Sequence, residues 1–409
     1  MNERSRKLLR VVQDEKPSSL GELIHEGVKA AIEQAIREEL AAVLGTEPYE
    51  RAEARRGYRN GTKPRQLSGP TGPLSLEVPR ATLFTPAGRQ EWVSRHLPRY
   101  QRRLPEINEA LTAAYLAGAN TRRIKGALRP LLKAAPLSKS AISRVVVTLK
   151  AAFDAWRKRS LEKLEVVVAY LDAFAIRVRS GGKVVSVPVL AAVVVLADGS
   201  KQLVSLELCG SESHVAWKGF LDDLVARGLR APLLAVIDGN AGLRSAVGLV
   251  WPKADVQRCT VHKLRNIERK VALYLREEIA DDYRSIVYAT NEQTARTAWV
   301  AFERKWEKRC PGAVASLTEG GDELLTYFRY PAQMWKTLRT TNVIERLNGE
   351  FRRRVKTQGS YPTEDAGPVL LFSLIASGQI KLRKLDGYEQ IAALINTRIQ
   401  RTAAVNDVL

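Results

Sequence analysis

The chain has 409 residues, of which 45% are hydrophobic and 27% charged, as is typical of a folded globular protein. Its formal net charge of +21 favours an anionic polymer as partner. We see no secretory signal, the longest apolar run (187–197) is far shorter than the roughly 20 residues that span a bilayer, and three cysteines are too few for a disulfide framework. These features argue against secreted, membrane-spanning and fibrous classes and indicate a cytoplasmic protein of more than one domain.

Residues 1–100 are predicted to form one helix and a small β or loop region that serves DNA binding or dimerisation. Over 18–45, apolar residues recur every three or four positions, which predicts an amphipathic helix. Glycine and proline punctuate residues 46–100, as in a unit of short strands and turns.

Positive charge is concentrated in residues 51–150, which hold 20 basic and 5 acidic side chains. The stretch contains a predicted Gly-Tyr-Arg-Asn-Gly turn at 57–61 and, within 101–160, short helices that resemble a helix-turn-helix. Clustered charge beside Tyr58 favours phosphate contact over the alternative, a solvated basic face without a ligand. The predicted DNA-binding residues here are Arg55, Arg56, Arg59, Lys63, Arg65, Arg122, Arg123, Lys125, Lys139 and Arg144.

The sequence becomes rich in β-forming residues at about residue 164. Turn signals join three predicted strands, at 166–178, 184–197 and 202–208. There follow a helix (213–227), a buried strand (233–237), a helix from Gly242, a short strand (255–258) and a long helix from His262. This β-β-β-α-β-α-β-α order is that of an RNase H-like α/β core, which we assign to residues 161–267. We expect the region that precedes it to be mainly helical.

Two carboxylates lie in or at the end of apolar strands. Asp172 interrupts the run 166–174, where an ionised group is costly unless a cation or hydrogen bonds compensate it. Asp238 ends the run 233–238, and functional groups gather at the carboxyl ends of strands in open α/β sheets. If the two strands are neighbours, the pair suits Mg²⁺, which takes one or two carboxylates together with phosphate oxygens.

A third carboxylate is required to complete such a site, and spacing alone leaves Glu345, Glu350 and Glu364 open. Glu345 is favoured because it lies on a predicted helix that starts near Thr340 and ends in basic residues. These residues, which we predict to hold a cleaved DNA strand, are Arg352, Arg353 and Arg354. The alternative for each acid is a turn-stabilising or salt-bridged carboxylate.

Cys259 and His262 form the only Cys-x-x-His pattern of the sequence. A tetrahedral zinc site needs two further ligands, and the remaining cysteines and histidines show no matching paired spacing. We therefore interpret the two residues as a structural pair that packs near the cleft. His262 also remains open as a phosphate or proton-transfer contact.

Seven segments, in order over nearly the whole chain, resemble the bacterial insertion-sequence transposases related to plant Mutator elements. They are Gly-Tyr-Arg-Asn-Gly (57–61), Val-Pro-Arg (78–80), Leu-Asp-Ala (171–173), 211–229, Ile-Asp-Gly (237–239), Gln-Arg-Cys-Thr-Val-His-Lys-Leu-Arg-Asn-Ile (257–267) and Thr-Thr-Asn-Val-Ile-Glu-Arg-Leu-Asn (340–348). Each segment alone is a weak signal, but together they are highly specific.

The resemblance implies a DDE triad of Asp172, Asp238 and Glu345 that binds Mg²⁺, with Mn²⁺ as a substitute. It also implies that Cys259 and His262 are the family's Cys-x-x-His motif. It further implies that an all-helical insertion (268–335) interrupts the RNase H-like core and that the final helices (336–409) carry the catalytic glutamate.

We therefore predict a DNA transposase that binds the terminal inverted repeats of its insertion sequence, cleaves them and transfers the ends to target DNA. Two ends must meet, so a homodimer or larger assembly on DNA is expected, at the nucleoid of a bacterial cytoplasm and without a membrane partner. Two alternatives stay open. One is an RNase H-like nuclease or resolvase, and the other is a catalytically silent, repurposed DNA-binding protein.

Overall fold

The computed structural model describes residues 20–50, 55–69, 72–104, 107, 109, 111–113, 139–180, 182–355 and 366–397. The chain divides into two compact units, residues 1–147 and 148–409. Helix α6 (Lys139–Lys158) runs across this boundary. Among the described residues, no helix is both long and apolar enough to cross a bilayer.

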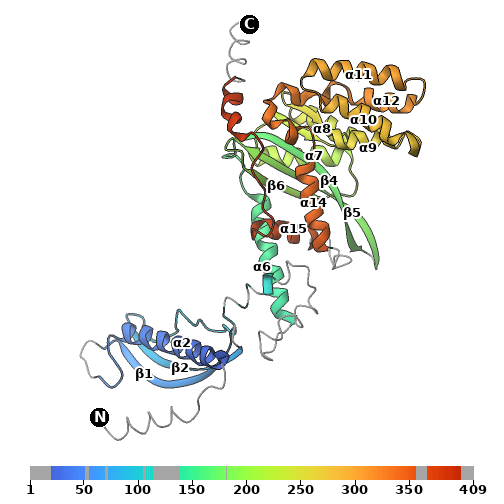
Figure 1. Cartoon of the computed structure of the whole chain (residues 1–409). Helices are drawn as coiled ribbons and strands as arrows, with labels where there is room; N and C mark the ends of the chain where they lie inside the picture. Colours follow the sequence, from blue (N-terminus) through green and yellow to red (C-terminus); the bar gives the residue numbers. More distant parts are fainter. Residues whose placement is uncertain are drawn as a thin grey trace. The chain divides into compact units, whose positions relative to one another are not determined.

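The N-terminal unit packs one helix on a three-stranded antiparallel sheet (Figure 1). Its elements are α2 (Leu20–Leu44), β1 (Gly57–Gly69), β2 (Gly72–Thr85) and β3 (Gly88–Glu91), with sheet order β1-β2-β3. The small core joins Ile36, Leu40 and Leu44 of the helix to apolar residues such as Leu67 and Leu74, which pair across the sheet. The helix predicted over 18–45 and the short strands predicted within 46–100 are therefore both found, whereas the broader expectation of a mainly helical N-terminal region is wrong for residues 20–104. The strands are mostly polar because only the few side chains that face the helix are apolar and buried.

The prediction of a turn for the Gly-Tyr-Arg-Asn-Gly segment (57–61) is also wrong. The segment is part of strand β1. Gly57 lies so close to β2 that an added Cβ would meet the Thr82 carbonyl oxygen at 2.1 Å. Gly61 has a positive φ of 72° and lies at the irregularity between Arg59 and Thr62, where the register of β1 and β2 shifts. The two glycines therefore permit a close strand approach and a bulge.

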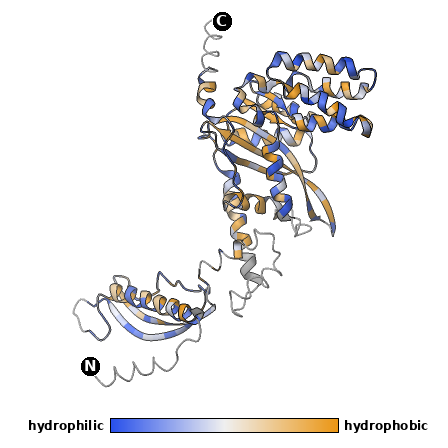
Figure 2. Ribbon diagram, viewed as in Figure 1, coloured by the Kyte–Doolittle hydropathy of each residue, from blue (hydrophilic) through white to orange (hydrophobic). Residues whose placement is uncertain are grey.

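The second unit is built on a five-stranded mixed sheet of order β6-β5-β4-β7-β8. The strands are β4 (Val166–Ser180), β5 (Lys183–Leu196), β6 (Lys201–Leu208), β7 (Leu234–Ile237) and β8 (Asp255–Arg258). Strands β4, β5 and β6 pair antiparallel, and β7 runs parallel to both β4 and β8. Each predicted strand of this region is found within two residues of its expected bounds. Figure 2 shows the hydrophobic character of these strands.

The two faces of β4 pack against different helices. Ala169 and Leu171 join the core formed with α7 (His214–Ala226) and α8 (Ala241–Val250). Tyr170 and Phe174 point to the other face, where the Tyr170 hydroxyl donates to the Thr337 carbonyl at 3.2 Å and the Phe174 ring contacts Phe351 of α14 (Asn342–Val355). Because side chains alternate along a strand, Asp172 lies on the α14 face.

A helical group separates β8 from α14 along the chain (Figure 1). Its α-helices are α9 (Thr260–Glu268), α10 (Arg276–Val287), α11 (Glu292–Trp306), α12 (Pro311–Gly320) and α13 (Trp335–Leu338), with short 3-10 turns at 273–275, 321–324, 326–329 and 332–334. Helices α9 to α12 share a core around Tyr283, Phe302 and Trp306. The helix predicted to be long from His262 is only nine residues, since the chain turns directly after it. The last elements are α15 (Ala366–Ala376), a 3-10 turn at 388–390 and a helical segment at 391–397.

Candidate active site

Asp172 is a buried carboxyl group in the centre of β4, with 6% of its surface exposed. Its Oδ1 accepts a hydrogen bond from the Ala173 N–H at 2.9 Å. Burial, followed by the negative charge of Asp238, raises the pKa of Asp172 to about 7, and Glu345 adds to this while His262 opposes it. The site therefore brings several charged groups close enough to act on one buried carboxyl group.

Asp238 follows the last residue of β7, beside Asp172 in the register of the sheet. Leu171 pairs with Ile237 in the parallel ladder, so the next residue on each strand is an aspartate. Oδ1 of Asp238 accepts from the Asn240 N–H at 2.9 Å, and the Asn240 side chain in turn caps α8. Gly239 allows this tight approach, since its φ is +99° and a Cβ there would lie 2.7 Å from the Arg258 guanidinium.

Glu345 lies in the first turn of α14 and is held by two cations from α9. Its Oε1 lies 3.2 Å from His262 Nε2 and accepts from Arg265 Nη1 at 3.0 Å. About a quarter of the Glu345 side chain is exposed (26%), compared with half of Arg265 (50%). Helix α14 is fixed against β4 by the Phe174–Phe351 ring contact, 5.7 Å between centroids.

Cys259 and His262 connect α9 to the start of α14. Sγ of the fully buried Cys259 accepts from the Thr341 N–H at 3.3 Å, and Thr341 Oγ1 lies 3.4 Å from His262 Nδ1. Burial raises the pKa of Cys259, but its hydrogen bonds with His262 and Thr341 prevail and the pKa is lowered. The same bond to Cys259 raises the pKa of His262 to about 9 despite burial, with further support from the thiolate, Asp172 and Glu345. The pair thus positions the helix that carries Glu345.

The donor set of the site partly fits a divalent cation. Asp172 and Asp238 offer carboxylate oxygens from adjacent strands, which suits Mg²⁺. Within the part of the chain that the structure describes, however, no three His, Cys, Asp or Glu side chains stand close enough to hold a metal ion. Glu345 is instead engaged by His262 and Arg265, and a cation at the aspartate pair would compete with them for this carboxylate.

Sequence reasoning missed Arg265 and Glu212 as neighbours of the carboxylates. Burial and the charge of Asp238 raise the pKa of Glu212, so it belongs to the same electrostatic surroundings. Arg265 lies within the 257–267 motif, but the local sequence around it does not indicate a contact with Glu345, which is 80 positions away.

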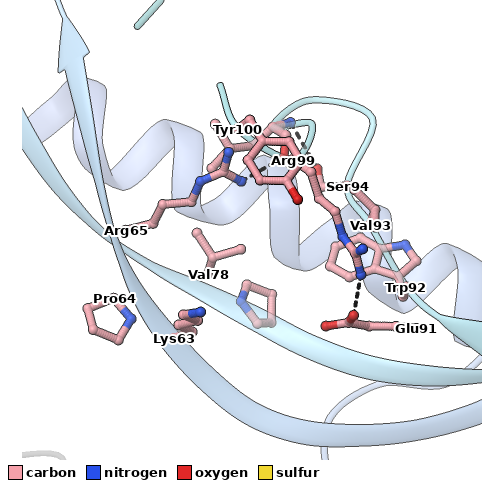
Figure 3. Close-up of a pocket in the computed structure, with 12 residues that line it drawn as sticks. Lys63, Pro64, Arg65, Val78, Glu91, Trp92, Val93, Ser94, Arg99 and Tyr100 are labelled. Carbon is pink, nitrogen blue, oxygen red and sulfur yellow. Dashed lines mark hydrogen bonds and ion pairs between the residues drawn. The ribbon is translucent and has the colours of Figure 1, made fainter. Parts of the chain in front are cut away.

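Several predicted DNA-contacting arginines have partners inside the N-terminal unit. Arg65 donates to the carbonyl oxygens of Leu97, Pro98 and Gln101 at 2.6–3.1 Å, and it lines a hollow with Lys63 and Tyr100, beside the Arg99–Glu91 pair (Figure 3).

Two further arginines of this group also bind carbonyl oxygens. Arg59 donates to Thr46 O at 2.7 Å, and Arg55 donates to Gly57 O at 2.7 Å and lies over the Tyr58 ring. Lys63 and Arg56 are exposed. Phosphate contact by these five residues stays a prediction.

The remaining predicted contacts are divided between described and undescribed parts of the chain. Arg352 is exposed, and Arg353 pairs with Glu350 on α14. The helix-turn-helix prediction falls mostly on 114–138, outside the described residues, as do the side chains of Arg122, Arg123, Lys125, Lys139, Arg144 and Arg354 and the residue Glu364.

Comparison with known proteins identifies the family. The profile described as "Transposase, Mutator family" matches residues 1–381. The transposase for insertion sequence element IS406 of Burkholderia multivorans is 34% identical over 358 residues, covering 86% of this chain and 89% of that protein. The transposase for ISRM5 of Rhizobium meliloti is 34% identical over 84% of each chain. The chain belongs to the Mutator family of transposases.

A solved structure, a chain of the "Drosophila P element transposase strand transfer complex", aligns with a TM-score of 0.41 and 11% identity over 68% of this chain and 92% of that chain. A score this low does not establish a common fold.

Proposed function

We propose that this transposase binds the terminal inverted repeats of its insertion sequence and catalyses cleavage and strand transfer with Asp172, Asp238 and Glu345. The observation that carries the proposal is the register of β4 and β7, which sets two aspartates side by side on a face that α14 covers with a third carboxylate. The raised pKa of Asp172 supports a role beyond packing, because perturbed carboxyl groups gather at functional sites.

The fold in which this happens is, we propose, an RNase H-like core interrupted by a helical insertion. The support is a mixed sheet of three antiparallel strands extended by two parallel ones, with α7 and α8 on one face and α14 on the other. Residues 161–267 and 336–409 would form the core and 268–335 the insertion.

Mg²⁺ or Mn²⁺ bound by the carboxylates would activate the attacking oxygen and stabilise the leaving oxygen of an in-line displacement. Asp172 and Asp238 would hold the cation from the sheet. Glu345, after leaving His262 and Arg265, would hold it from α14. The freed cationic side chains would then lie beside the DNA phosphates.

The proposed reaction has two displacements at phosphorus. Water attacks a phosphodiester at the element end and releases a 3′-hydroxyl, and this hydroxyl then attacks a phosphodiester of target DNA and displaces another 3′-oxygen. No side chain becomes bonded to DNA, unlike in recombinases with a nucleophilic side chain. Because two ends must join one target, we propose that a dimer or larger assembly acts on DNA.

The test is a cleavage and joining assay with the full chain, Mg²⁺, labelled duplexes that carry the repeats flanking the coding region, and a target plasmid. The wild type should nick the ends and join them. Asp172→Asn should lose both activities by about 10²–10³-fold or more and bind the ends as before. Asp222→Asn, a change to an exposed carboxylate on α7 that pairs with Lys218, is the matched control.

Each other outcome selects against the proposal. Strand transfer by a folded Asp172→Asn chain contradicts the catalytic assignment. Cleavage by the wild type without joining supports the nuclease or resolvase, and end binding without either activity supports a silent DNA-binding protein.

A further inference from the structure

A strongly basic groove lies on α14 beside the face that carries Glu345. The hollow, of about 690 Å³, is bounded by α13, by α14 and by the segment 379–386 that follows α15. Six cationic and two acidic side chains line it: Lys201, Lys336, Arg346, Lys381, Arg383, Lys384, Glu350 and Asp386. The function proposed above gives this groove no role.

Most of the positive charge in this groove is available to a ligand. The side chains of Lys336, Arg346, Lys381 and Arg383 are exposed, and none of these four side chains forms a hydrogen bond or ion pair with another described residue. The two acids have other partners, because Glu350 pairs with Arg353 outside the groove lining and Asp386 accepts from Thr337 Oγ1 at 3.1 Å. The groove therefore presents uncompensated cations.

The remaining two lysines fix the groove wall. Lys201 Nζ donates to the Lys384 carbonyl, and Lys384 Nζ donates to the Asp198 carbonyl, both at 3.1 Å. Lys384 also lies over the Tyr388 ring, 4.5 Å from its centroid. Burial lowers the pKa of Lys201. The negative charge of Asp386 raises this pKa in part, and the positive charge of Arg346 lowers it again. The partly buried Lys201 and its neighbour Arg346 repel each other, and a bound anion would reduce this repulsion.

The position of the groove on α14 links it to the active site. Glu345 points to His262 and Arg265, whereas its neighbour Arg346 lines the groove together with Asn342 and Glu350. Residues four apart lie on one helix face, so Asn342, Arg346 and Glu350 form one stripe and Glu345 belongs to another. A ligand in the groove would not occupy the carboxylate site.

We propose that this groove binds the phosphodiester backbone of DNA next to the active site. An extended polyanion fits better than a single phosphate ion, because four exposed cations are spread over α13, α14 and the 381–383 segment. The lining also offers hydroxyl and amide donors, from Thr340, Asn342 and Gln379, for phosphate oxygens. The proposal rests on the proposed function for its substrate, but it concerns binding alone.

The test measures DNA binding by the full chain in EDTA, where cleavage does not occur, at a series of salt concentrations. Lys381→Gln combined with Arg383→Gln should weaken binding to duplex DNA about tenfold and reduce the slope of log affinity against log salt by about 2, near 0.9 per lost phosphate contact. Lys253→Gln combined with Lys308→Gln removes the same charge from exposed positions outside the groove and should leave the slope nearly unchanged. A thermal melt checks that both variants are folded.

Two duplexes identify the source of the backbone. If the double variant binds both unrelated DNA and terminal-repeat DNA more weakly, the groove contacts DNA of any sequence. If only binding to terminal-repeat DNA is weaker, the groove contacts the end of the element. Either result supports the proposal. Affinity and slope equal to those of the wild type on both duplexes would overturn it. Because no activity is measured, a failed strand-transfer assay would not produce that result.

Discussion

Charged side chains stand out in both units of this protein, but the structure uses them differently. In the second unit, Asp172 is buried in a strand and its pKa is raised by its surroundings. In the N-terminal unit, Arg55, Arg59 and Arg65 direct guanidinium groups to backbone carbonyl oxygens of their own fold. A carboxylate in an apolar strand therefore indicates a functional site, whereas an arginine in a basic stretch can stabilise the fold, bind a ligand or do both.

The physical reason is the cost of burial. An ionised carboxyl group inside a sheet loses its hydration and persists only where something compensates it, so its presence in a sequence is informative. Arginine can cover apolar surface and satisfy several carbonyl oxygens while it remains near water. Counting arginines thus locates a basic unit without identifying which of them bind a ligand.

The largest effect on the contrast between the two units is expected from Cys259→Ala, which removes the buried sulfur that contacts Thr341 and His262 and so positions Glu345. The buried Thr341 N–H would lose its acceptor at a cost of about 1–3 kcal/mol, and α14 would lose one of the contacts that hold it to α9. Strand transfer should fall about tenfold or more, in proportion to the movement of Glu345. Cys259→Ser, which keeps an acceptor, should restore most of the activity, and Cys310→Ala, in the helical group, is the control.

Equal activity of Cys259→Ala and wild type would mean that the Cys-x-x-His pair does not position the glutamate.

The next effect separates structural from exposed basic residues in the N-terminal unit. Arg65→Gln removes a cation that donates to three carbonyl oxygens and should destabilise the β1–β2 sheet by about 2 kcal/mol. Lys63→Gln, at an exposed position of the same strand, should leave stability unchanged and reduce the salt slope of DNA binding by about 1. Hydrogen exchange of the Leu67 and Leu74 amides in the full chain reports the first change.

If Lys63→Gln destabilises the sheet as much as Arg65→Gln, the distinction between the two roles is wrong.

The smallest effect concerns the pH dependence of the metal-free protein. Because the pKa of Asp172 is raised to about 7, its contribution to stability is fully present below about pH 3.8 and is lost as the pH rises through 7. Asp172→Asn has no charge to bury and should therefore be more stable than wild type by about 1–2 kcal/mol at pH 8, with a smaller difference at pH 5. Thermal unfolding in EDTA measures this; a variant that is less stable at pH 8 contradicts the burial account.

Much of the second unit could be predicted from the sequence because its strands are apolar runs bounded by turns. Asp172 and Asp238 interrupt or end those runs, so their placement in one region followed from the order of elements. The helix α9 was expected to be longer, since apolar periodicity continues past Glu268 even though the chain turns there.

The N-terminal unit was harder to predict. Strand β1 is polar along most of its length, with Leu67 among its few buried side chains, so its sequence resembles a basic loop. Gly57 and Gly61 signalled a turn, whereas they permit a close strand approach and a bulge. The partners of Glu345 lie on α9, 80 positions before it in the case of Arg265, and local patterns carry no such pairing.

The central claim, that three carboxylates share one divalent cation, is tested most directly by calorimetric titration of the full chain with Mn²⁺. Asp172→Asn, Asp238→Asn and Glu345→Gln should each weaken the same binding event by about tenfold or more, which is about 1.4 kcal/mol. Glu350→Gln, on the same helix but facing the basic groove, should bind as the wild type does. Unchanged Mn²⁺ affinity in Glu345→Gln, or in both aspartate variants, would contradict the account.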